Sequence, residues 1–175
     1  WSSDVCSSDL ASTQVAALGT EQLVAVQTRA IASLSSAQIS ALSTAQTVAL
    51  TTAQVAVLTS GALTGISTAG VVELTTEQLA AFTSQQLAAL NTRQIAALTT
   101  AQVGAIETAD ISGLTAAQAA VLDSNQLNGL GETQVAALTD EQIKGLTATQ
   151  IPTLDSGFIS SLTATQIQAF TSTQL

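Results

Sequence analysis

The chain has 175 residues, of which 46% are hydrophobic and only 9% are charged, and its formal net charge is −9. Disordered chains usually combine low hydrophobicity with high charge, so this composition predicts a folded protein. An acidic chain with only three basic residues repels polyanions, which argues against nucleic-acid binding. No apolar run approaches the roughly 18 to 20 residues that a membrane-spanning helix needs.

Residues 1–10, WSSDVCSSDL, precede the pattern that fills the rest of the chain. This segment back-translates codon by codon into a string that looks like the end of a widely used sequencing adapter. We interpret it as adapter carried into an assembled metagenomic read and exclude it from the fold; a genuine natural N-terminus is the alternative. The segment holds the only Cys (Cys6) and the only Trp (Trp1), so no thiol chemistry is expected in the remainder.

From residue 11 to residue 175 the chain repeats an eight-residue phrase, which we call an octad, and residues 51–58, TTAQVAVL, are representative. An unbroken short repeat predicts a solenoid, here a single repeat domain over residues 11–175. Because the chain lacks a starting Met and ends within an octad, we expect it to be a fragment of a longer array. Position four of the octad is Gln sixteen times, and the exceptions, none of which shifts the frame, are Ala30, Ala62, Gly70, Asp110 and Phe158.

The apolar positions of the octad exclude both a continuous helix and an ordinary strand. Position five is Val, Ile or Leu except at Thr47 and Ala119, position eight is always apolar, and position seven is mainly Ala, Gly or Ser. Eight residues at about 3.6 per turn overshoot two turns by roughly 80°, so the apolar stripe would wind around a continuous helix. Positions five and eight would face opposite sides of a strand. Each octad must therefore contain a break.

The residues at the start of each octad indicate where a helix begins. Position one is Ser, Thr, Asp, Asn or Gly in nearly every octad, and these residues are preferred at a helix N-cap. With Gln three residues later they form the capping box S/T-x-x-Q, and pairs such as Leu50 and Val55 match a hydrophobic staple. Eight of the ten acidic residues after residue 10 lie at positions one to three, where the helix dipole favours anions. The pattern predicts an all-α solenoid of about twenty short, roughly two-turn, capped helices.

Stacking is required because ordering eight residues costs more than two buried aliphatic side chains contribute. Small residues at position seven are expected to let neighbouring units approach, and the recurring Gln to join stacked units. A β-solenoid is the alternative, which Thr, Val and Ile would suit; the Ala and Gln content and the capping box argue against it. We expect irregularity at residues 59–74, where two successive octads lack the Gln. Either a hinge or simple drift of the repeat would explain the loss of the Gln there. A second irregular patch is expected at residues 150–162, because Pro152 would fall inside a helix.

No constellation of residues indicates chemistry. Asp123 and Asp155 lack the alternating oxygen ligands of a calcium loop and are explained as N-caps. Asp140 and Glu141 are interpreted as a solvated first helical turn and not as an acid–base pair. There is no His, and Ser and Thr hydroxyls have no partner that would activate them. We therefore expect no catalytic residues, no cofactor-binding residues, no metal ligands, no cofactor and no enzymatic activity.

The phrases LTTAQVAVL (residues 50–58), LTTEQLAAF (74–82) and LTTAQVGAI (98–106) resemble bacterial repeat arrays that are often labelled large repetitive, haem-utilisation or adhesion proteins. The resemblance covers residues 11–175. The haem label gains no support from the residues, because His, Met and Tyr are absent.

Repetition without reactive side chains favours a structural spacer or stalk within a large bacterial surface or secreted protein, with the neighbouring repeats as its main partners. The alternatives are a protein- or glycan-binding adhesin module and, more remotely, ice binding through ranked Thr side chains. An extracellular or cell-surface location without membrane insertion is expected.

Overall fold

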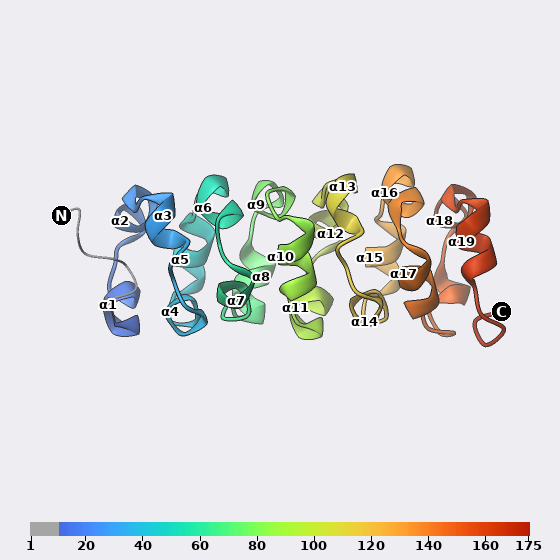
Figure 1. Ribbon diagram of the computed structural model, residues 1–175, viewed down its shortest axis with the longest axis horizontal. Helices are drawn as coiled ribbons and strands as arrows, with labels where there is room; N and C mark the ends of the chain where they lie inside the picture. Colours follow the sequence, from blue (N-terminus) through green and yellow to red (C-terminus); the bar gives the residue numbers. More distant parts are fainter. Residues whose placement is uncertain (1–10) are drawn as a thin grey trace.

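The computed structural model describes residues 11–175, so the adapter interpretation of residues 1–10 lies outside the described residues. Within residues 11–175 the secondary structure is entirely helical, which confirms the predicted all-α solenoid. Successive short helices wind around a common long axis and build a rod (Figure 1). The helices are α1 (Ser12–Ala16), α2 (Thr20–Ala25), α3 (Thr28–Ile31), α4 (Ser36–Ser40), α5 (Thr44–Ala49), α6 (Thr52–Ala56), α7 (Ser60–Leu63), α8 (Thr68–Glu73), α9 (Thr76–Ala80), α10 (Ser84–Ala89), α11 (Thr92–Ala97), α12 (Thr100–Ala105), α13 (Thr108–Ile111), α14 (Ala116–Ala119), α15 (Ser124–Asn128), α16 (Glu132–Ala137), α17 (Asp140–Gly145), the 3-10 helix η2 (Ile151–Thr153), α18 (Ser156–Ser161) and α19 (Ala164–Ala169).

Each octad consists of a short helix followed by a corner in extended conformation. The helix begins at position two, and the corner is formed by position eight and the next position one, as in Leu98 (φ −59°, ψ 141°) and Thr99 (φ −74°, ψ 160°). The α-helices are four to six residues long. They are therefore somewhat shorter than the predicted two turns, because about 3.6 residues make one turn and the corner takes two residues of each octad.

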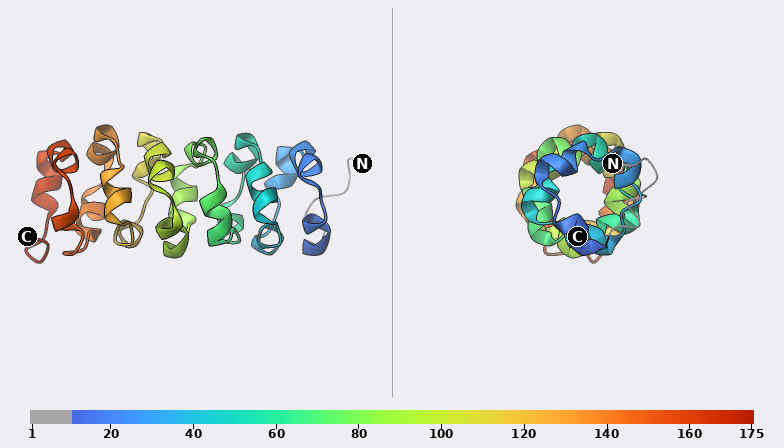
Figure 2. Two further views of the ribbon diagram at one scale, coloured as in Figure 1. Left: turned by 180° about the vertical axis from the view of Figure 1, so that it is seen from behind. Right: turned by 90° about the vertical axis from the view of Figure 1, so that its left-hand side faces the viewer.

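One turn of the superhelix contains between three and four octads. Helices three octads apart pack against each other, as α9 does with α12 and α14 with α17. Hydrogen bonds described below connect an octad to the octad four units earlier. Each octad therefore lies between the octads three and four units earlier in the previous turn. Viewed along the long axis, the helices form a ring (Figure 2).

Positions five and eight supply nearly all of one continuous hydrophobic core that extends from Val15 to Phe158. The two exceptions at position five are also buried, because Ala119 is small and the Thr47 hydroxyl donates a hydrogen bond to the Ser43 carbonyl at 3.0 Å. Only near the C-terminal end is position five open, where 55% of Ile167 is exposed. The octads that cover this position elsewhere lie three or four units further along the chain.

Small residues at position seven allow the backbones of neighbouring turns to come close. Gly65, Gly113 and Gly145 each lie against position two of the octad three units earlier. A Cβ atom added to Gly145 would lie only 2.6 Å from the carbonyl oxygen of Ala116. The close approach that the composition of position seven predicted is therefore present at these octads.

The octad that contains Pro152 is distorted, as its sequence predicts. A turn and the 3-10 helix η2 replace the α-helix, because Pro has no N–H to donate and its ring clashes with the preceding turn. Asn128, three octads earlier, secures this segment: its Nδ2 donates to the Thr153 carbonyl at 2.9 Å, and its Oδ1 accepts from the Asp155 N–H at 3.0 Å. The superhelix continues through the distortion without a change of frame.

Candidate functional site

The most specific polar arrangement in the molecule surrounds the Gln at position four, and Gln102 illustrates it. Its Oε1 accepts a hydrogen bond from the N–H of Thr99 at 2.8 Å, while its own N–H donates to the Thr99 hydroxyl at 3.2 Å. Its Nε2 points to the previous turn and donates to the carbonyls of Val71 (2.9 Å), Val72 (3.0 Å) and Leu74 (2.7 Å). One buried side chain, only 3% exposed, thus starts its own helix and ends another.

This arrangement, which we call a glutamine bridge, recurs along the whole array. In each case Nε2 donates to the carbonyl of position eight, and to that of position five or six, in the octad four units earlier. The Nε2···O distances to position eight lie between 2.5 and 2.9 Å. The residues that form such bridges are Gln46, Gln54, Gln78, Gln86, Gln94, Gln102, Gln118, Gln126, Gln134, Gln142, Gln150, Gln166 and Gln174.

The bridges solve a problem that short helices pose. The last carbonyls of a helix have no partner within the helix, and a four- to six-residue helix consists almost entirely of such end groups. Leaving a buried carbonyl unpaired is costly, so each amide stabilises the end of one helix and links two turns of the superhelix. The bridges therefore hold successive turns together with directional bonds in addition to hydrophobic packing.

Octads without the Gln use position four differently. The side chain of Asp110 has no N–H to donate, and its Oδ1 instead accepts from the backbone N–H of Ser84 at 2.7 Å, three octads earlier. Phe158 is buried and packs into the hydrophobic core. Ala62 and Gly70 carry no hydrogen-bonding side chain and occupy two successive octads.

The acidic residues considered as candidate ligands act as helix caps or lie in first turns. Asp123 Oδ1 accepts from the Gln126 N–H, and Asp155 Oδ1 accepts from the Phe158 N–H, both at 2.8 Å. Asp140 and Glu141 lie in the first turn of α17. Among residues 11–175, no group of three or more acidic, His or Cys side chains is placed to hold a metal ion.

In the part of the chain that the structure describes, Glu77 and Lys144 have shifted pKa values. Glu141 forms an ion pair with Lys144 at 2.8 Å, and this hydrogen bond raises the pKa of the Lys144 amine. The pKa of Glu77 is lowered, first by the hydrogen bond from its own backbone N–H and then by the Thr75 hydroxyl. Both groups lie on the outside of the rod, so their pKa shifts are properties of the surface and do not indicate an enclosed site.

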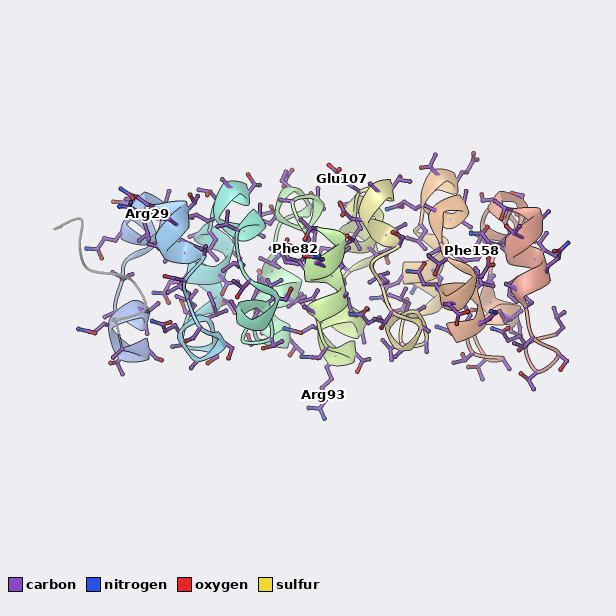
Figure 3. All side chains as sticks on the ribbon, in the orientation of Figure 1. Arg29, Phe82, Arg93, Glu107 and Phe158 are labelled. Carbon is purple, nitrogen blue, oxygen red and sulfur yellow. The ribbon has the colours of Figure 1, made fainter. Side chains whose placement is uncertain are left out.

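The charged side chains are scattered over the outer surface. In Figure 3, Arg29, Arg93 and Glu107 project away from the rod at separate places, whereas Phe82 and Phe158 lie among the helices. A surface depression lined by Thr44, Ala45, Val48 and Glu73 lies between α5 and α8. In the described part of the chain, no helix is both long and apolar enough to cross a membrane.

Sequence reasoning assigned the Gln a structural role but missed its partner. Half of the bridge, the local capping of the N-cap N–H by Oε1, follows from the capping box. The other half, donation to carbonyls 28 to 31 residues earlier, does not. A signal was present: Glu caps an N-terminus as well as Gln and suits the helix dipole better, yet position four is never Glu.

Comparison with known proteins gives one family. The model of the ALTTAQ repeat matches the chain four times, over residues 15–52, 24–60, 71–106 and 103–140. No match was found among curated proteins or among solved structures.

Proposed function

Since the chain belongs to the ALTTAQ repeat family, we propose that its array is a non-catalytic structural spacer or stalk within a large bacterial surface or secreted protein. The observation that carries this proposal is the recurrence of the glutamine bridge. The bond that joins Gln46 to Leu18 near one end of the array also joins Gln174 to Leu146 near the other. The same contact therefore serves every turn.

A spacer needs a length that is set by the number of repeats. In a solenoid each unit contacts only near neighbours, so adding units extends the structure without changing its cross-section. Here those neighbours lie three octads away through helix packing and four octads away through the bridges. Each additional turn would thus add a constant increment of length.

The test is to measure the length of arrays with different numbers of octads, made by removing whole octads from one end of the chain. Small-angle X-ray scattering gives the maximum dimension and the radius of the cross-section. We expect the maximum dimension to grow linearly with octad number at a constant cross-sectional radius. A maximum dimension that grows as the cube root of the chain length, as in a compact globule, would contradict the proposal.

A protein- or glycan-binding module is the second candidate, and the exposure of positions two and three favours it. Thr100 and Ala101 are exposed, as are the corresponding residues in most octads, so hydroxyl-bearing and small side chains cover the outside of the ring. Binding of the purified repeat protein to immobilised glycans or to bacterial surface proteins would favour this candidate over the spacer. Lack of saturable binding in both assays would leave the spacer as the better account.

Ice binding is a third and more remote candidate, because it requires a flat surface of regularly spaced Thr side chains. The helices form a ring in cross-section (Figure 2), which distributes these side chains around a curved surface. A thermal hysteresis assay tests this candidate directly, and we expect no hysteresis.

A further inference from the structure

The glutamine bridges are interrupted at one place for two octads in succession. Position four of the octads that contain α7 and α8 is occupied by Ala62 and Gly70, neither of which can donate a side-chain hydrogen bond. By the four-octad rule their partners would be the carbonyl ends of α3 and α4. These two helix ends therefore receive no amide from the following turn, whereas α2 is bridged by Gln54 and α5 by Gln78.

The gap covers one side of the rod. Since a turn holds three to four octads, two adjacent unbridged octads leave about half of one turn boundary without these bonds. The remaining part of the same boundary is held by Gln54, before the gap, and by Gln78, after it. The boundary is thus joined on one side and held mainly by apolar packing on the other.

Single gaps elsewhere are filled in other ways. Asp110 replaces the bridge by a hydrogen bond to Ser84, and Phe158 replaces it by burying an aromatic ring in the core. Ala62 is buried but small, and Gly70 has no side chain. Neither kind of compensation is therefore available at α7 and α8.

Two further observations fall at the same place. A surface depression lies next to this boundary, between α8 and the bridged helix α5, beside Glu73, which holds position seven where most octads have a small residue. The ALTTAQ repeat model also leaves residues 61–70 unmatched between its second and third matches. The local sequence has thus departed from the repeat at the point where the bonds between turns are missing.

We propose that this boundary is a joint, at which the superhelix opens and bends before it does so elsewhere. Opening separates α7 and α8 from α3 and α4, while the bridges of Gln54 and Gln78 keep the other side closed, so the joint bends in one direction. This inference goes beyond the spacer function and holds whether or not the array serves as one. It divides the array into two stiffer segments, residues 11–58 and residues 75–175.

Hydrogen–deuterium exchange of the full chain tests the joint, because local opening exposes backbone amides. In the natural chain we expect the amides of α3 and α4 to exchange about tenfold faster than those of α5 and α6, which are bridged by Gln78 and Gln86. A repaired variant, Ala62→Gln with Gly70→Gln, should slow exchange in α3 and α4 about tenfold and leave α14 unchanged. Equal exchange in the natural chain, or no slowing after repair, would overturn the proposal.

A matched variant keeps the proposal testable if the repaired chain does not fold. Gln118→Ala with Gln126→Gly copies the Ala and Gly pair into two other successive octads, removing the bridges to Leu90 and Leu98. Exchange should then rise in α10 and α11, the helices that lose their bridges, and remain unchanged in α5 and α6. A rise spread evenly over the array would overturn the proposal.

Bending is measured separately with spin labels on two exposed residues of α4 and α7, helices that pack against each other across the joint. Cys6 is first replaced by Ser, and labels are attached at Ala37→Cys and Gly61→Cys, which lie three octads apart. A control pair at Arg93→Cys and Ala117→Cys occupies the same octad positions across a bridged boundary. We expect a broader distance distribution across the joint than across the control, narrowing on repair; equal widths would contradict a joint.

Discussion

Replacing Gln102 by Glu changes one atom of a glutamine bridge and converts a donor into an acceptor. In the natural chain Nε2 lies 2.9, 3.0 and 2.7 Å from three carbonyl oxygens of the previous turn. A carboxylate oxygen at this place faces the same three acceptors with no hydrogen to share. The side chain is almost completely buried, so solvent cannot reduce the repulsion.

The size of the destabilisation follows from the cost of removing the hydrogen-bond partner of a buried polar group. Losing the bonds and leaving the carbonyls unpaired costs about 1–3 kcal/mol, which is the expectation for Gln102→Met. A buried, uncompensated charge raises this to about 3–5 kcal/mol for Gln102→Glu at neutral pH. Burial and the facing carbonyls raise the pKa of the introduced carboxyl, so acidification neutralises it and restores one donor. The destabilisation should therefore grow as the pH rises above the ordinary Glu range and shrink below it.

The assay is urea denaturation followed by circular dichroism at neutral and at acidic pH. Ala101→Glu is the matched control, because Ala101 is exposed in the same helix and other octads carry Glu at this position. We expect the control to change the free energy of unfolding by less than about 0.5 kcal/mol. The reasoning would be refuted if Gln102→Glu were no more destabilising than the control at neutral pH, or if acid did not reduce its relative effect.

Three further predictions concern other parts of the octad. Gly145→Ala should destabilise the array by about 1–3 kcal/mol, because the added Cβ meets the Ala116 backbone. Gly61→Ala should stabilise it by about 1 kcal/mol, because the space around Gly61 is open and Ala favours a helix. Equal midpoints of urea denaturation for the two variants would contradict this prediction. Pro152→Ala should increase the helical signal in circular dichroism and raise stability by roughly 1–3 kcal/mol, and a loss of helix would show that η2 is the preferred conformation. Because the pKa of Glu77 is lowered, its carboxylate stabilises the fold above the ordinary Glu pKa, and this contribution is lost as the pH falls through the lowered value. The melting temperatures of the natural chain and of Glu77→Gln should therefore converge in acid. A difference that stays constant with pH would contradict this prediction.

The helices could be predicted because their determinants lie within a single octad. The N-cap residue, the Gln three positions later and the apolar residues at positions five and eight all act over fewer than eight residues, as in residues 51–58. Even octads that lack the Gln, such as the one containing α8, form a helix, because Ser67 still caps it. Pro152 was recognisable for the same reason, since its effect on a helix is local.

The arrangement of the turns could not be predicted, because it depends on contacts between residues that the repeat makes equivalent. A Gln amide that donates four octads back gives the same sequence pattern as one that donates three or five octads back. Only the shape of the corner, set by the dihedral angles of residues such as Leu98 and Thr99, decides how many octads complete a turn. A repeating sequence fixes the unit but leaves the periodicity of the superhelix open.

The glutamine bridges also have a consequence for folding during synthesis, because all of them point the same way along the chain. In every bridge the donor follows its acceptor carbonyls in the chain by 28 to 31 residues, as Gln54 follows Leu23 and Val26. During synthesis the acceptors of each turn are therefore already in place when the donor leaves the ribosome. We therefore expect each new octad to dock on helix ends that are already synthesised, so that folding proceeds from the N-terminal side.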